Sequence, residues 1–282
     1  MRLALGTANL GQRYGISNSS QVSQVDAIEI IQLAYQLGFR DFDTAPEYGN
    51  AEELVGKSLY GFEKKIQIKI SSGYSSNLNE TKKSVVKSLK NLKIEKAETI
   101  LFHDPNFYKS DVFPQIVQSI IDEGFSKNVG LSCYSAEDAI EAHLRCNLVN
   151  FFQVPENILD RRILDNQDIL NLSNEGCKFQ IRSAFLQGLL LMNPNQLPKA
   201  LSSCRAPIQM LNDFAMSNNL NIIQLLLSYA MQIKWADSVV VGANSIQQLK
   251  EIAIAKKNLI EVDWEQFQSI PEPQIDPRNW HE

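Results

Sequence analysis

The chain has 282 residues, of which 44% are hydrophobic and 21% are charged, and its formal net charge at pH 7 is −5. This is the composition of a globular protein with enough apolar surface to form a buried core. The 27 basic residues are scattered along the chain. A concentrated positive face is therefore not expected, and we predict neither nucleic acid nor a membrane as a partner.

The N-terminal segment MRLALGTANLG contains only a short apolar run, and no later stretch approaches about 18 uninterrupted apolar residues. We therefore expect a cytoplasmic protein. The four cysteines, Cys133, Cys146, Cys177 and Cys204, have no C-x-x-C spacing, and the chain has three histidines. This pattern predicts reduced thiols and no metal site.

Short apolar runs alternate with amphipathic stretches along the first half of the chain. Strands are predicted at residues 3–7, 39–43, 65–70 and 99–103. Helices are predicted after the capping residues Ser23 and Asn77, near residues 50–59, and along the face formed by Val112, Ile116, Ser119 and Ile120.

The second half repeats this alternation. Strands are predicted at residues 127–132, 150–154, 178–183 and 238–242. Helices are predicted after the capping box at Ser135, from about Arg161 to Ser173, at 205–217 and 221–234, and after Ser245. An irregular segment, LQGLLLMNPNQLP, follows the seventh strand.

Strict alternation of strands and helices predicts a parallel α/β sheet, because parallel neighbours need a crossover connection. Eight such units without a linker predict a single (β/α)8 TIM barrel domain over residues 1–282, with an extra helix between strand 7 and the last strand. The alternative is a doubly wound open sheet, whose dinucleotide-binding form carries G-x-G-x-x-G in its first turn. That turn here reads GTANLGQRYG, which lacks this spacing, so the barrel is favoured.

Four polar side chains fall at or just after the ends of neighbouring predicted strands: Asp43, Tyr48, Lys69 and His103. In a barrel, the carboxyl ends of the strands share one rim, where active sites lie. Each residue alone has an ordinary explanation, such as an aspartate that caps a turn. Together they indicate a site.

The chemistry of these groups indicates carbonyl reduction. An ammonium about 4 Å from a phenol favours the phenolate by about 4 kcal/mol at an effective dielectric of about 20, or roughly three pKa units. We therefore expect Lys69 to lower the pKa of Tyr48 towards neutral pH, while Asp43 keeps Lys69 protonated. His103 is expected to orient a carbonyl oxygen. A nicotinamide cofactor must supply the hydride, because no side chain does so.

Segments from one end of the chain to the other carry a resemblance that agrees with this chemistry. They are LGTANLG, DFDTAPEYGNAEELVG, KIQIKIS, ILFHDPN, VGLSCYS, FFQVPENILDRR, IRSAFLQGLLL and SVVVGANSIQQLKEI. In these segments the sequence resembles the aldo-keto reductases. The resemblance implies a (β/α)8 barrel, NADP(H)-dependent interconversion of carbonyl and alcohol, and a catalytic tetrad at Asp43, Tyr48, Lys69 and His103. It selects Asp43 over Asp41, because the acid of the family directly precedes Thr-Ala.

The resemblance also implies cofactor contacts. Ser132 and Gln153 match positions that hold the nicotinamide carboxamide, although Cys133 replaces the usual Asn. Arg182 stands where many members stack an aromatic ring on the nicotinamide, and its planar guanidinium is able to stack in the same way. The segment from Ser183 to Gly188 matches the loop at the pyrophosphate. The implied cofactor residues are Gly6, Thr7, Ala8, Ser132, Gln153, Arg182, Ser183, Leu186, Gly188, Gly242, Asn244, Ser245 and Gln248.

The sequence departs from the family where the 2′-phosphate would bind. Members specific for NADP(H) often carry Lys and Arg at the positions of Gly242 and Gln248, and a neutral amide binds a phosphate less strongly than a guanidinium does. NADP(H) is therefore favoured, and NAD(H) is possible. Alternatively, Ser245 and Gln248 form only a capping box.

The expected substrate is a small carbonyl compound or carbohydrate. The chain begins almost at the first strand and ends with PEPQIDPRNWHE, without a long C-terminal loop, so we expect an open site. Tyr14, Tyr74, Phe107, Tyr134 and Trp280 are the aromatic candidates for lining it.

Two other functions remain open. One is a regulatory or sensing subunit that binds the nicotinamide cofactor with little turnover. The other is a barrel lyase or isomerase in which Lys69 forms a Schiff base, although Asp43 would keep that lysine charged.

Overall fold

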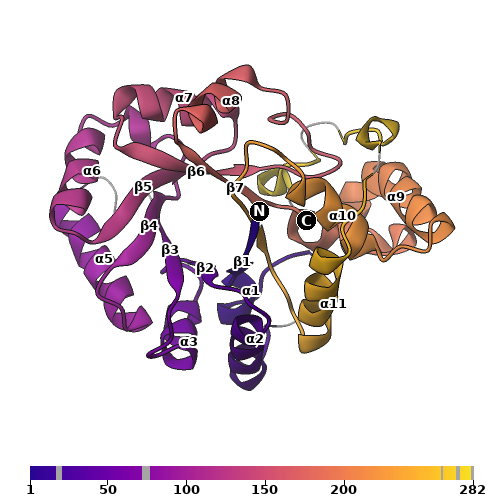
Figure 1. Ribbon diagram of the computed structural model, residues 1–282, viewed down its shortest axis with the longest axis horizontal. Coiled ribbons are helices and arrows are strands. Elements are labelled where there is room, and N and C mark those ends of the chain that lie inside the picture. The colour runs from indigo at the N-terminus through magenta and orange to yellow at the C-terminus, as the bar shows by residue number, and fades with distance from the viewer. Residues whose placement is uncertain (17–20, 72–76, 262, 271–273, 281–282) are drawn as a thin grey trace.

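The computed structural model describes residues 1–16, 21–71, 77–261, 263–270 and 274–280. Its eight strands form a closed barrel in which every neighbouring pair is parallel and the order follows the sequence (Figure 1). The predicted barrel is therefore confirmed. The strands are β1 (Arg2–Gly6), β2 (Asp41–Thr44), β3 (Lys65–Ile70), β4 (Ala97–Phe102), β5 (Ser126–Ser132), β6 (Val149–Pro155), β7 (Lys178–Arg182) and β8 (Ser238–Val241).

The α-helices surround the barrel as an outer layer (Figure 1). Both α9 (Arg205–Ser217) and α10 (Ile222–Met231) lie between β7 and β8 in the sequence, which confirms the predicted extra helix. Among the described residues, no helix has the length and apolar character needed to span a membrane. The α-helices are α1 (Ala8–Gly11), α2 (Gln24–Gln36), α3 (Ala51–Ser58), α5 (Leu78–Leu92), α6 (Phe113–Asp122), α7 (Ala136–Arg145), α8 (Gln167–Asn174), α9 (Arg205–Ser217), α10 (Ile222–Met231) and α11 (Ile246–Lys257).

Polar side chains begin several of these helices at the predicted positions. The side chains of Ser23, Asn77, Ser135 and Ser245 each accept a hydrogen bond from a backbone amide in the first turn of their helices. Ser135 forms a complete capping box with Asp138. Such bonds satisfy amide groups that have no partner within the helix.

The predicted helix from Arg161 to Ser173 is wrong in its first half, because α8 begins only at Gln167. The guanidinium of Arg161 donates hydrogen bonds to the carbonyl oxygens of Trp264 and Phe267, at 2.5 and 2.9 Å. These contacts join segments more than a hundred residues apart. Residues 162–165 form turns, which local periodicity does not predict.

Successive residues of each strand point alternately towards the helices and into the barrel. The side chains that face the helices are apolar and fully buried, as Phe42, Ile68 and Ile181 show. The barrel interior is partly polar, because Asp43 and Lys69 pair with each other inside it. The fold therefore places hydrophobic packing around the barrel and polar groups within it.

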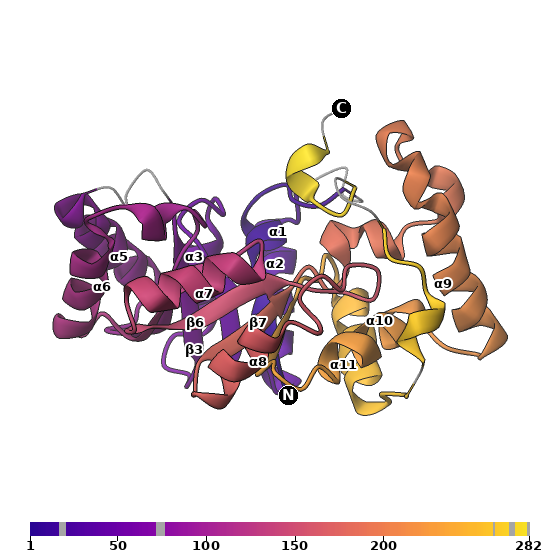
Figure 2. The same cartoon turned by 90° about the horizontal axis from the view of Figure 1, so that it is seen from above.

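Figure 2 shows the barrel from the side, with the N-terminus at one end and the C-terminal segment at the other. Since β1 starts at the N-terminus, the C-terminal segment lies at the end where the strands finish. A short 3-10 helix, Pro277–Asn279, belongs to this segment. The C-terminal residues are therefore positioned over the rim that carries the candidate site.

Candidate active site

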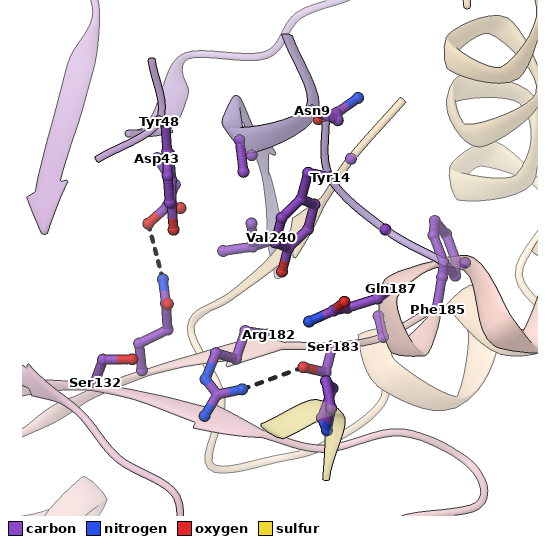
Figure 3. Close-up of a pocket in the computed structure, with 18 of the residues that line it drawn as sticks. Asn9, Tyr14, Asp43, Tyr48, Ser132, Arg182, Ser183, Phe185, Gln187 and Val240 are labelled. Atoms are coloured by element: carbon purple, nitrogen blue, oxygen red, sulfur yellow. Dashed lines mark hydrogen bonds between the residues drawn. The ribbon is translucent and has the colours of Figure 1, made fainter. Parts of the chain in front are cut away.

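A pocket of about 290 Å³ opens at the carboxyl ends of the strands. Asp43, Tyr48, Lys69 and His103 all line it. They come from β2, the loop after β2, β3 and the residue that follows β4. The structure thus brings together the four polar residues that the sequence indicated. Figure 3 shows Asp43 and Tyr48 on one wall of the pocket, with Tyr14 and Arg182 beside the open space.

Two glycines allow the loop that carries Tyr48 to lie directly on α1. A Cβ atom on Gly11 would be 1.9 Å from the carbonyl oxygen of Tyr48, and a Cβ atom on Gly49 would be 2.2 Å from the carbonyl oxygen of Gly11. Gly49 also has a positive φ of 59°, which glycine adopts without steric cost. Gly11 and Gly49 therefore allow the close contact that positions the phenol of Tyr48.

Lys69 and Asp43 form a buried ion pair beside Tyr48. The Nζ atom of Lys69 lies 2.8 Å from Oδ2 of Asp43, and their side chains are 7% and 3% exposed. The same Nζ atom lies 5.3 Å from the centre of the Tyr48 ring. Burial alone would lower the pKa of Lys69, but the negative charge of Asp43 and the phenol of Tyr48 outweigh it and raise the pKa. Lys69 is therefore an ammonium at neutral pH, which argues against a Schiff-base role.

The pKa of Tyr48 differs from the expectation. Burial, which disfavours the charged phenolate, raises the pKa of Tyr48 to about 12, although Lys69 lowers it by its charge and by hydrogen bonding. The expected decrease in the pKa of Tyr48 is therefore wrong, because the loss of water around the buried phenol outweighs the charge of Lys69. At neutral pH, Tyr48 holds its proton and is able to donate it.

His103 completes the group of polar side chains. Burial lowers the pKa of His103, and the positive charge of Lys69 lowers it further. The imidazole is therefore neutral at neutral pH, with one ring nitrogen protonated. Such a ring is able to donate a hydrogen bond to an oxygen in the pocket without adding a charge.

A profile of the Aldo/keto reductase family matches residues 2–272 of the chain. The chain belongs to this family. It is an oxidoreductase, and its closed eight-stranded barrel is the fold of this family.

Two curated relatives match this aldo-keto reductase over most of their length. L-galactose dehydrogenase from Arabidopsis thaliana is 23% identical over 283 residues, covering 91% of this chain and 84% of the relative. D-arabinose 1-dehydrogenase from Saccharomyces cerevisiae is 23% identical over 288 residues, covering 88% and 80%. Among solved structures, the holo form of the aldo-keto reductase AKR11C1 from Bacillus halodurans has a TM-score of 0.75 at 20% identity, covering 98% of this chain and 95% of that one. It shares the fold.

Most of the residues assigned to the cofactor line the same pocket of the reductase. They are Gly6, Ala8, Ser132, Gln153, Arg182, Ser183, Gly188, Gly242, Asn244 and Gln248. The other three have different positions. Thr7 is buried and donates to the carbonyl oxygen of Asp43 at 3.0 Å, Leu186 lies in the core, and Ser245 caps α11.

The side chain of Gln153 contacts the ion pair. Its Oε1 atom accepts a hydrogen bond from Nζ of Lys69 at 3.0 Å, and its Nε2 atom donates to Oδ1 of Asp43 at 2.9 Å. The second hydrogen on Nε2 is donated to Gln180 at 2.7 Å. Only Oε1 of this amide therefore keeps a free lone pair for a carboxamide.

Arg182 stacks on a protein side chain in this structure. Its guanidinium carbon lies 4.4 Å from the centre of the Tyr134 ring, and its Nη2 atom donates to the carbonyl oxygen of Cys133 at 2.9 Å. Among the described residues, its buried Nε atom has no hydrogen-bond partner. This nitrogen is a donor that a ligand in the pocket is able to use.

The segment after β7 has an unusual backbone. Ser183, Leu186, Gln187 and Gly188 all have positive φ values, between 46° and 89°. Three of these residues are not glycine, and such clusters of sparsely populated conformations occur at ligand-binding sites. This turn borders the pocket through Ser183, Gln187 and Gly188.

Ser245 caps the last helix, but the side chain of Gln248 bonds to the residue before the cap, so the predicted capping box forms only in part. The Oγ atom of Ser245 accepts from the amide of Gln248 at 3.1 Å, and Oε1 of Gln248 accepts from the amide of Asn244 at 2.8 Å. Gln248 and Asn244 also line the pocket. The helix cap and the pocket wall are thus formed by the same side chains.

The pocket includes residues that were not among the candidates. Asn9 in α1 contacts the loop after β8, since it donates to the carbonyl oxygen of Ala243 and to Oδ1 of Asn244 at 2.5 and 2.7 Å. Asn9 directly follows Gly6, Thr7 and Ala8 in LGTANLG, and this position could have indicated a pocket residue. Gln187 and Arg278 also line the pocket. Arg278 was not foreseen, because it belongs to the C-terminal tail.

The C-terminal tail corrects the expectation of an open site. Pro277 and Arg278 line the pocket, and the guanidinium carbon of Arg278 lies 3.6 Å from the centre of the Tyr134 ring. Arg278 is held by Asp276, to which its Nε atom donates at 2.9 Å. The tail therefore covers one edge of the site.

Of the four aromatic candidates within the described part of the chain, Tyr14 and Tyr134 line the pocket. Phe107 packs against Phe102 in the core. Trp280 donates its indole hydrogen to the carbonyl oxygen of Gln274 at 2.7 Å. Tyr74 lies outside the described residues.

Proposed function

We propose that this aldo-keto reductase interconverts a carbonyl compound and an alcohol, with NADP(H) as the cofactor and Tyr48 as the general acid and base. The observation that carries the proposal is the placement of a buried, protonated phenol beside the Lys69–Asp43 ion pair in one pocket. A proton donor with a fixed neighbouring cation is what reduction of a carbonyl needs, because the donor becomes negatively charged as it gives up its proton.

Each polar residue has a distinct part in the proposed reaction. In reduction, Tyr48 donates its proton to the carbonyl oxygen as the carbon receives hydride, and Lys69 stabilises the phenolate that remains. Asp43 keeps Lys69 charged and oriented. His103, which is neutral, donates a hydrogen bond to the same carbonyl oxygen and holds it beside the phenol. In oxidation, the phenolate accepts the proton of the alcohol.

The residues of the pocket fit a nicotinamide cofactor, which supplies or accepts the hydride when it is bound. Ser132 and Oε1 of Gln153 would hold the carboxamide, and Arg182 would contact the cofactor through its unpartnered Nε atom. The strained turn at Ser183–Gly188 would approach the phosphates. We expect NAD(H) to be accepted as well, because Asn244 and Gln248 present neutral groups where the 2′-phosphate would lie.

We further propose a sugar or another hydroxylated aldehyde or ketone as the substrate. Two relatives are named as dehydrogenases of L-galactose and D-arabinose. The pocket offers hydroxyl and charged groups from Tyr14, Tyr134 and Arg278 in addition to the catalytic residues. Such groups satisfy the hydroxyls of a polar substrate, which an apolar pocket would leave unpaired.

The proposal is tested by two measurements on the purified protein. Fluorescence titration with NADPH and NADH is expected to show binding of both, and a panel of aldoses, ketoses and simple aldehydes is expected to include substrates that oxidise the bound cofactor. Cofactor binding without turnover of any member of the panel, in either direction, would instead support the regulatory alternative.

A further inference from the structure

A line of buried polar side chains continues from the ion pair into the barrel. Gln153 on β6 donates to Oε1 of Gln180 on β7 at 2.7 Å, and Nε2 of Gln180 donates to Oγ of Ser238 on β8 at 3.0 Å. The three residues are paired across neighbouring strands. Gln153 and Gln180 are fully buried, and Ser238 is 1% exposed.

Lys69, Asp43 and Gln180 together fix the direction in which the amide of Gln153 points. Its oxygen accepts from the Lys69 ammonium, and its nitrogen donates to the Asp43 carboxylate. A reversed amide would place N–H groups against an ammonium and an oxygen against a carboxylate, and both arrangements are repulsive. Gln180 accepts the remaining N–H of Gln153, so that all hydrogens on this nitrogen have partners.

The direction of the third N–H of Lys69 follows from the other two. An ammonium has three donors in tetrahedral arrangement. One is directed at Asp43, at 2.8 Å, and one at Gln153, at 3.0 Å. The third N–H remains for the phenol of Tyr48, with which Lys69 also forms a side-chain hydrogen bond. The orientation of the Gln153 amide therefore affects how well the Lys69 ammonium is aligned with the phenol of Tyr48.

We propose that Gln180 is a positioning residue for the reaction at Tyr48: it holds the amide of Gln153, which in turn directs the Lys69 ammonium at the phenol. Gln180 is not among the residues that line the pocket, so it acts only through Gln153. The inference rests on the proposed function of Tyr48 and Lys69. Buried polar pairs often stabilise a fold no more than apolar residues of similar volume do. The test therefore measures the effect of Gln180 on the orientation of Gln153 and Lys69, and not its effect on stability.

Two substitutions at Gln180 separate positioning from packing. Gln180→Leu keeps a similar volume but removes both hydrogen bonds. Gln180→Glu keeps an oxygen that accepts from Gln153, and its other oxygen is able to accept from the hydroxyl of Ser238. Gln67→Leu is the matched control, because Gln67 is also a buried glutamine of the barrel interior, two residues before Lys69 on β3, and its Oε1 has no partner among the described residues.

We expect Gln180→Leu to lower kcat about ten- to hundredfold, because the phenol loses an aligned ammonium. Gln180→Glu is expected to recover most of the lost kcat, and Gln67→Leu to keep the kcat of the parent. Equal kcat values in Gln180→Leu and the parent, or equal losses in Gln180→Leu and Gln67→Leu, would overturn the inference.

A readout independent of turnover separates this inference from the proposed function. In the parent, the side-chain amide protons of Gln153 are expected to exchange slowly with solvent in NMR spectra, because both have buried acceptors. In Gln180→Leu, these amide protons should exchange faster. If Gln180→Leu does not fold, Ser238→Ala replaces it and should show the same faster exchange. Unchanged exchange would overturn the inference even in an active enzyme. A parent that reduces no carbonyl would contradict the proposed function alone.

Discussion

The backbone of Gly11 lies directly against the backbone of Tyr48, since a Cβ atom on Gly11 would be 1.9 Å from the Tyr48 carbonyl oxygen. Gly11→Ala must therefore displace the loop that carries the phenol. We expect a loss of kcat of about a hundredfold and a loss of stability of about 1–3 kcal/mol. Steady-state kinetics and denaturant unfolding measure the two effects.

Gly124→Ala provides the comparison for this substitution. Gly124 has a φ of +70°, and a Cβ atom there would meet nothing within 4 Å. Only backbone strain is expected, with a cost of about 1 kcal/mol and unchanged kcat. If Gly11→Ala behaved like Gly124→Ala, the close contact with Tyr48 would have no part in positioning the phenol.

The pH dependence of carbonyl reduction follows from Tyr48 and His103. Burial raises the pKa of Tyr48 to about 12, so the proton donor stays protonated through neutral and moderately alkaline pH. Burial lowers the pKa of His103, so this ring stays neutral until the pH falls below its ordinary value of about 6.5. We expect kcat for reduction to be nearly constant from about pH 7 to about pH 9. If kcat declined with a midpoint near neutral pH, and the same decline were seen in His103→Gln, a group other than Tyr48 and His103 would control the reaction.

The cofactor preference is expected to depend on Gln248. Gln248→Arg places a guanidinium at the pocket wall, where a charge-assisted pair with a 2′-phosphate is roughly twice as strong as a neutral hydrogen bond. We expect the ratio of the Kd values for NADH and NADPH to rise about tenfold. The control is Gln247→Arg, because Gln247 is exposed and its side chain bonds to Glu251. Equal responses of the two variants would place the phosphate elsewhere.

A buried carboxyl outside the site is expected to make stability depend on pH. Glu156 is fully buried, and its Oε1 accepts from the hydroxyl of Tyr229 at 2.6 Å. Burial raises the pKa of Glu156 well above its usual range, so the folded protein binds a proton that the unfolded chain has released. Stability is therefore lost as pH rises from the ordinary glutamate pKa through the raised one.

Glu156→Gln removes this titration and keeps an oxygen acceptor for Tyr229. Relative to the parent, we expect the variant to gain at least about 1 kcal/mol at about pH 8, and to lose that advantage as the pH falls to about 4. Denaturant unfolding at several pH values measures the difference. Glu63→Gln, at an exposed position, should show no such trend. An advantage that does not change with pH would mean that Glu156 does not titrate in this range.

The barrel and the rim position of Asp43, Tyr48, Lys69 and His103 were predictable because both follow from local patterns. Strand and helix periodicities alternate clearly, and parallel strands bring their carboxyl ends to one rim. Contacts between distant segments were not predictable in this way. Arg161 bonds to Trp264 and Phe267 and the next four residues form turns, although the periodicity there favours a helix.

The electrostatics of the site were predicted only in part. Proximity of Lys69 to Tyr48 was expected from strand order, but the degree of burial that raises the pKa of the phenol depends on the whole barrel. The contacts of Tyr134 with Arg182 and Arg278 likewise need β7 and the C-terminal tail to meet. No local signal in the sequence encodes that meeting.

The most direct measurement is single-turnover hydride transfer from prebound NADPH to an accepted aldehyde, comparing the parent with Tyr48→Phe and with Tyr14→Phe. Tyr14 is a second phenol in the same pocket, and Tyr14→Phe serves as the matched control. The account predicts that Tyr48→Phe slows transfer by about 10²–10⁴-fold, with NADPH affinity nearly unchanged, because only the proton donor is lost. It predicts a much smaller effect for Tyr14→Phe. Transfer in Tyr48→Phe as fast as in the parent would contradict the central claim that Tyr48 protonates the carbonyl.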